Sequence, residues 1–386
     1  MKKTNLLLSA LVIFVLILPL ALPAQDQKEP SPQKSQLWKM KMAELYQTLS
    51  DLLPDLVSHE RFYDQKNYAK IQKNAEKLTD LSHLIAPDAD PSIGYISNMF
   101  EDESKRAVAE LKRGNRTYAR NILQNVTGYC IACHSRNNTG PQFPLLKLNE
   151  SIKKLSRFEK AEFFAATRQY DQALEEYQAV LADPKLAQTR PIEWERAARN
   201  ALAVGIRVKN NADTAMIIAD RVMSTPTAPL FLRENATAWK KNIEKWKTEP
   251  ARKIETTEGL YAEANRLIAA ALEAQQYPAD RSGDVFYLRA SATLHDLLGR
   301  APKGKHAAEA LLLSGIAYEA LRDMGLWSLH EFQYKGCILA APHTDVAKNC
   351  YTRLEESIYA GYSGSGGVSI PADVLRELKE LKKKVK

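Results

Sequence analysis

The sequence predicts an all-α protein. Apolar residues recur at spacings of three and four along most of the chain after residue 37, and prolines and glycines separate the periodic segments. No segment alternates apolar and polar residues over a length that would indicate a strand. The chain has 386 residues, 45% of them hydrophobic, which is enough for more than one packed domain.

The N-terminus has the pattern of an export signal. Lys2 and Lys3 precede an apolar stretch that runs from Leu6 to Leu22, and small residues follow up to Ala24. We therefore expect a signal peptide over 1–24 and a periplasmic location for the rest. The alternative is an uncleaved membrane anchor, because the stretch is near the lower limit for spanning a bilayer. The polar residues 25–36 are predicted to be a linker.

The charge pattern gives no support for a nucleic-acid partner. Loss of residues 1–24 would remove two lysines and no acid, so the formal charge would fall from +8 to +6. Basic and acidic residues are interleaved, and only Lys382–Lys384 forms a basic run. Such a surface is either simply solvated or suited to steering an acidic redox partner.

Residues 37–140 are predicted to form a four-helix bundle. The helical pattern divides into four long segments, and Pro87, Pro91 and Gly114 mark breaks between them. Their expected ranges are 37–58, 62–85, 91–112 and 115–135.

The last of these segments contains Cys130, Cys133 and His134 in the order C-x-x-C-H. Two thiols three residues apart can each bond to a vinyl group of a porphyrin, and the next imidazole can then ligate the iron. The motif predicts one covalently bound c-type haem. The alternatives are a redox-active dithiol, half of a zinc site and a plain disulfide, but the thioredoxin setting and a second zinc half are both lacking in the sequence.

A bundle whose last helix ends in this motif resembles the cytochrome c′ family. The resemblance covers about 37–140, and outside the haem motif it rests on Arg113–Arg120 and Val126. It implies a first-helix residue on the distal side of the haem and allows dimerisation through the bundle. The chain departs from the family after His134, where Ser135 to Gly140 replace the expected aromatic–Arg ending.

The first helix offers Met42 as the sixth iron ligand. Met42 falls on one apolar stripe with Leu45 and Leu49, whereas Met40 falls outside it, although a methionine on such a stripe can also be core filling. His59, His83 and Met99 are lesser candidates. Arg136 is either a partner of a haem propionate or a solvated side chain.

Residues 151–360 are predicted to form an irregular solenoid of helical hairpins. The stretch from Ala161 through Tyr170 and Tyr177 to Pro184 resembles a tetratricopeptide repeat, and later units match it less well. An ordinary helical bundle is the alternative. The expected helices are 151–167, 170–182, 191–209, 212–224, 229–247, 256–276, 284–299, 305–323, 326–341 and 344–360, and a flexible loop and a C-terminal helix are expected over 361–386.

Cys337 and Cys350 lie at equal distances from a midpoint just after Pro342. A helical hairpin that turns there would set them opposite each other, so a disulfide is predicted, with two buried free thiols as the alternative.

Together these features predict an exported single-haem electron carrier, not an enzyme, whose repeats dock a partner protein. The first alternative is a five-coordinate haem that senses or binds a small gas. The second is an interaction scaffold in which the haem is structural.

Overall fold

The computed structural model describes residues 32–82, 91–124, 150–250, 253–277, 279–322 and 329–386. The all-α prediction is confirmed, because helices make up nearly all of the regular structure in these ranges. None of the helices within these ranges is both long and apolar enough to cross a bilayer.

The first part of the chain contains α1 (Pro32–Val57), α2 (His59–Tyr63), the short η1 (Gln65–Asn67), α3 (Tyr68–Ser82), α4 (Pro91–Lys112) and a helical segment at 116–124. Helix α1 starts five residues earlier than expected, with a proline in its first turn, so 32–36 are helical and not linker. The second helix, predicted over 62–85, instead begins at His59, where the side chain of Ser58 caps α2, and it is divided at Asp64, whose side chain caps η1. Helix α3 packs against both α1 and α4.

The rest of the chain is a succession of helices that pack on their neighbours. A helix expected from 151 is divided at Ser156, which forms a capping box with Glu159. These helices are α6 (Glu150–Lys153), α7 (Arg157–Ala166), α8 (Tyr170–Leu181), α9 (Pro184–Thr189), α10 (Pro191–Ala203), the π-helical η2 (Val204–Val208), α11 (Ala212–Met223), α12 (Leu230–Thr248), α13 (Thr257–Ala274), α14 (Asp284–Arg300), α15 (Ala307–Ala320), α16 (Leu329–Ala340) and α17 (Asp345–Gly361).

The glycine-rich segment after α17, expected to be a loop, contains a small antiparallel hairpin of β1 (Ser363–Gly364) and β2 (Gly367–Val368). Gly367 has a φ of +100°, which favours glycine in this turn. Helix α18 (Ala372–Lys383) follows, and the amide of His343 donates to the Lys384 carbonyl at 2.7 Å. The end of the chain is thereby attached to the turn between α16 and α17.

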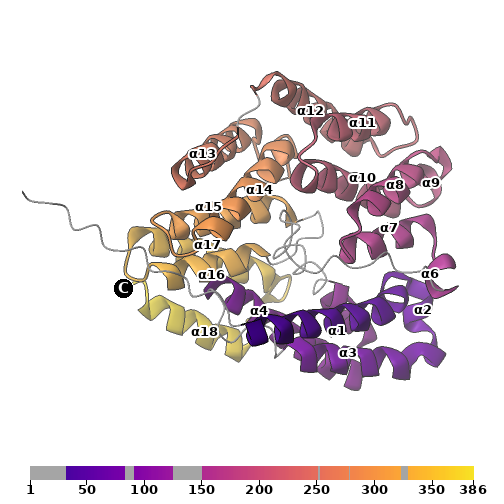
Figure 1. Ribbon diagram of the computed structural model, residues 1–386, viewed down its shortest axis with the longest axis horizontal. Helices are drawn as coiled ribbons and strands as arrows, with labels where there is room; N and C mark the ends of the chain where they lie inside the picture. The colour runs from indigo at the N-terminus through magenta and orange to yellow at the C-terminus, as the bar shows by residue number, and fades with distance from the viewer. Residues whose placement is uncertain (1–31, 83–90, 125–149, 251–252, 278, 323–328) are drawn as a thin grey trace, which may run out of the picture.

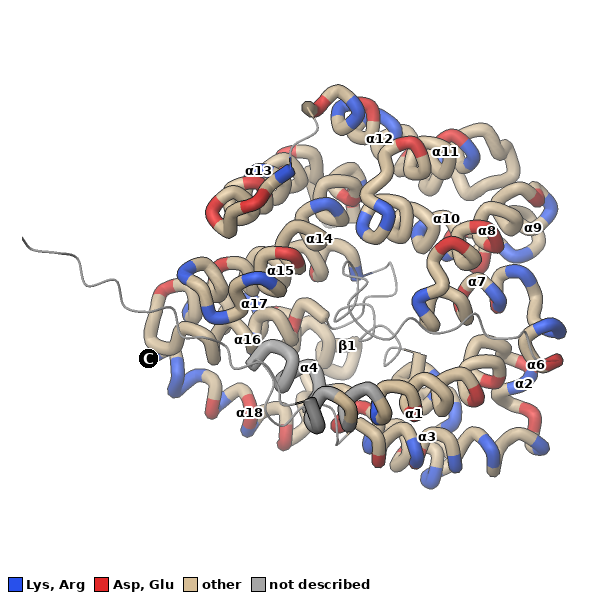
Figure 2. Tube along the Cα trace, viewed as in Figure 1, with Lys and Arg blue, Asp and Glu red and all other residues tan. Residues whose placement is uncertain are grey.

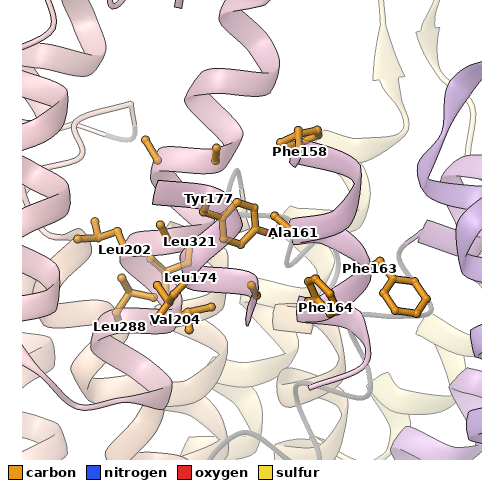
Figure 3. Packing of buried hydrophobic residues seen from close by; sticks show 14 of the residues in the cluster. Phe158, Ala161, Phe163, Phe164, Leu174, Tyr177, Leu202, Val204, Leu288 and Leu321 are labelled. Atoms are coloured by element: carbon orange, nitrogen blue, oxygen red, sulfur yellow. The ribbon is translucent and has the colours of Figure 1, made fainter. Parts of the chain in front are cut away.

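One large core runs through much of the molecule. Figure 3 shows the part where Phe158, Ala161 and Phe164 of α7 meet Leu174 and Tyr177 of α8. Leu288 of α14 and Leu321 after α15 belong to the same cluster. The helices on either side of this core are therefore held by shared apolar burial.

The helices form an arc that the first part of the chain closes (Figure 1). Helix α1 contacts α7 near the start of the arc, and α4 contacts α16 near its end. Lysines, arginines and acids are interspersed along the helices (Figure 2). The first part of the chain therefore touches both ends of the arc.

Candidate functional site

The predicted haem-attachment residues lie outside the described residues. Cys130, Cys133, His134 and Arg136 all fall within 125–149. The structure does describe the helical segment 116–124, which precedes the motif, and α1, which carries the predicted sixth ligand.

The segment 116–124 starts after a tight turn at Gly114, whose φ is +82°. The guanidinium of Arg116 lies over the rings of Tyr68 and Tyr63, at 5.0 and 5.5 Å from their centroids, and donates to the Phe62 carbonyl. The Tyr63 hydroxyl donates to Oγ1 of Thr117 at 3.0 Å. Side chains from α2 and α3 thus fix where this segment begins.

Arg120 connects the same segment to α1. Its Nε and Nη2 donate to the carbonyls of Leu56 and Val57, each at 3.1 Å, where α1 ends and its carbonyls lack helical partners. Burial lowers the pKa of Arg120. Arg120 thereby joins the segment before the motif to the last turn of α1.

The end of α1 also holds a buried carboxylate. Asp55 is fully buried and pairs with Nη2 of Arg61 at 2.6 Å and Nζ of Lys70 at 2.7 Å. Two cations on one carboxylate meet the requirement that a buried charge be paired. Because Arg61 belongs to α2 and Lys70 to α3, the pairs join three helices.

Met42 lies on the buried face of α1. Its side chain is 9% exposed and belongs to the main core with Leu45 and Leu49, whereas Met40 is 62% exposed. The predicted orientation of the two methionines is confirmed. Tyr46, one turn further on, is also buried, and burial raises the pKa of its hydroxyl.

The structure gives little further support to the lesser candidates. The ring of His59 lies 4.5 Å from that of Tyr63, centroid to centroid, at the start of α2. His83 and the side chain of Met99 are outside the described residues. Within the described ranges, no group of three or more His, Cys, Asp or Glu side chains is arranged to hold a metal ion.

Cys337 and Cys350 form the predicted disulfide, with their Cα atoms 6.3 Å apart. The bond joins α16 to α17, and both cysteines are fully buried. The signal in the sequence was the symmetry of the two positions about a midpoint just after Pro342.

Several polar groups were not found by sequence reasoning. Glu162 accepts hydrogen bonds from Tyr177 at 2.6 Å, Arg196 at 2.7 Å and Asn200 at 2.8 Å, which links α7, α8 and α10. A second group surrounds the buried Asp284, which accepts from Nε1 of Trp239 at 3.2 Å. Their members are up to 45 positions apart and follow no motif, so no local pattern could have indicated them.

Helix α16 meets α17 in a third polar group. The ring nitrogen Nε2 of His330 lies 2.7 Å from Oγ of Ser357, and this hydroxyl donates to Glu331 at 2.9 Å. Burial lowers the pKa of His330. Because Glu331 contacts the serine and not the histidine, the group lacks the order of a nucleophilic triad.

The chain matches no protein-family model, no curated protein and no solved structure.

Proposed function

We propose that this chain is an exported c-type cytochrome with one haem, attached through Cys130 and Cys133 and ligated by His134, that transfers single electrons. The observation that carries the proposal is the C-x-x-C-H spacing, whose two thiols and adjacent imidazole are the donor set of a covalent haem. The bound haem would supply the one-electron chemistry, and the protein would set its potential and its access.

Met42 is the proposed sixth ligand. Its thioether is on the buried face of α1, as a distal ligand requires.

Helices α1, α3, α4 and the segment at 116–124 are proposed to be a cytochrome c′-like bundle, and α7 to α17 a tetratricopeptide-like solenoid. The packing of α3 on both α1 and α4 supports the first assignment, and the capped pair α7 and α8 supports the second. We propose that a redox partner docks on the repeats.

The experiment is an absorption spectrum of the full chain, made in a host that attaches c-type haem, in both oxidation states and with carbon monoxide. We expect a covalent haem that withstands denaturation and does not respond to carbon monoxide, because a Met-ligated iron is closed to gases. Cys130→Ser should abolish two-point attachment, whereas Cys337→Ser, which removes a disulfide cysteine, should leave it intact.

Met42→Ala should open the sixth position and produce a carbon monoxide response. Met40→Ala is the matched control, because Met40 is exposed on the same helix and its loss should leave the spectrum unchanged. A carbon monoxide response in the unmodified chain would favour gas binding over electron transfer as the function. A chain without haem would overturn the proposal.

A further inference from the structure

Three arginines are buried where α10 and η2 meet the start of α14 and the end of α15. Arg199, Arg207 and Arg281 are each at most 7% exposed. Arg207 donates to the Tyr318 hydroxyl and Arg281 to the Ala320 carbonyl, both at 2.5 Å. These contacts hold two of the guanidinium groups against the last turn of α15.

Arg199 is only partly paired. Its Nε donates to Glu195 at 2.8 Å, and its guanidinium lies over the ring of Trp239. Its Nη1 is 3.9 Å from Oδ2 of Asp284, which is beyond hydrogen-bond distance. Among the described residues this buried nitrogen has no hydrogen-bond partner. A buried, charged donor without an acceptor is costly, and a ligand oxygen would remove the cost.

The surrounding charges are unbalanced in favour of the cations. Burial lowers the pKa of Arg281, and the positive charges of Arg199 and the exposed Arg322 lower it further, against the effect of Asp284. Burial raises the pKa of Asp284 to about 7, despite both arginines. At neutral pH, the charges of Arg199, Arg281 and Arg322 therefore outweigh those of Glu195 and of a carboxyl that is only partly ionised.

The local backbone is also irregular. Helix α10 continues into the π-helical η2, in which the amide of Lys209 bonds to the Val204 carbonyl. Such π turns occur often at functional sites because they change the direction of the following side chains. The π turn directs Arg207 to Tyr318 on α15 and follows directly on α10, which carries Arg199.

We propose that Arg199, Arg281 and Arg322 form a binding site for a small oxyanion, a carboxylate or a phosphate. Guanidinium groups bind such anions through paired N–H donors. The burial of Arg199 and Arg281 favours a small ion over an extended chain. The site goes beyond the proposed electron transfer, and its test does not depend on haem.

The test is thermal unfolding of the full chain at pH 8 with increasing phosphate or acetate, at an ionic strength held constant with sodium chloride. A bound anion should raise the Tm until the site is saturated. Asp284→Asn keeps an acceptor for Trp239 but removes a competing carboxylate, so it should lower the apparent Kd by about tenfold. Phosphate and acetate are separate arms, which show which of the two anions the site takes.

Arg322→Glu reverses a charge at the exposed edge of the site and should abolish the anion effect. Arg157→Gln is the control, because Arg157 is exposed, pairs with Glu176 and is not one of the arginines of the site. If the anions raise the Tm equally in the native chain, Arg322→Glu and Arg157→Gln, the proposal is wrong. It is also wrong if Asp284→Asn folds and binds neither anion more tightly.

Discussion

Gly315 lies where a side chain would not fit. A Cβ atom added there would overlap the ring of Tyr334, which packs α16 onto α15. We expect Gly315→Ala to lower the free energy of unfolding by about 1–3 kcal/mol, since a rigid buried ring has to move. Urea denaturation would measure this.

Gly336 provides the control on the neighbouring helix. A Cβ atom there would lie 3.6 Å from Leu311, an ordinary contact. Gly336→Ala should therefore be neutral, or stabilise by up to about 1 kcal/mol through helix propensity. Equal losses for both variants would contradict a role for the close approach at Gly315.

Asp284 gives the folded protein a specific pH dependence. Its pKa is raised from 3.8 to about 7. Between these values the native chain keeps a proton that the unfolded chain has released, so stability falls as pH rises through this window and the effect is complete above it. Urea denaturation from pH 4 to pH 8 should show the decrease, and Asp284→Asn should remove that part of it. If the stability of Asp284→Asn fell with pH as steeply as that of the native chain, the raised pKa of Asp284 would be contradicted.

At the scale of elements, Arg120 fastens the segment before the haem motif to the end of α1. Arg120→Ala removes two hydrogen bonds and leaves the Leu56 and Val57 carbonyls without this donor, so we expect a loss of about 2 kcal/mol. Arg113→Ala is the matched control, because Arg113 is largely exposed and should cost little. Chemical denaturation of both variants would test this, and a similar loss in both would contradict it.

The disulfide is the second link between elements. Replacing both Cys337 and Cys350 by serine should lower the free energy of unfolding by about 3 kcal/mol. Without the bond, the 13-residue separation between the two positions no longer forms a closed loop, so the unfolded chain gains conformational entropy. A reductant should give the same loss in the native chain and none in the double variant. If the free energy of unfolding fell in neither experiment, the packing of α16 on α17 would be sufficient to hold the two helices without the bond.

The elements also show how far sequence reasoning reaches. Helical periodicity predicted most of the helices, and the symmetric cysteines predicted their bond. The division at Ser156 was visible as a capping box, since Glu159 follows three residues later, but apolar periodicity continues across it and hides it. The contacts of Arg120 with Leu56 and of Trp239 with Asp284 depend on tertiary packing, for which a single sequence has no local signal.

At the scale of the whole molecule, the two parts of the chain are expected to unfold together. The main core includes residues of α1, α7 and α14, and α4 packs on α16. Shared burial couples these elements, so calorimetry of the full chain should show one transition. Two separated transitions would show that the first part folds independently of the arc.

The closure of the arc limits how this protein can change in length. A helical array with open ends can gain or lose a hairpin at little cost, because each unit touches only its neighbours. Here the first part of the chain contacts α7 and α16 at once, so an inserted hairpin between them would separate one contact from the other. The number of helices in the arc is thus set by the distance that the first part of the chain spans between α7 and α16.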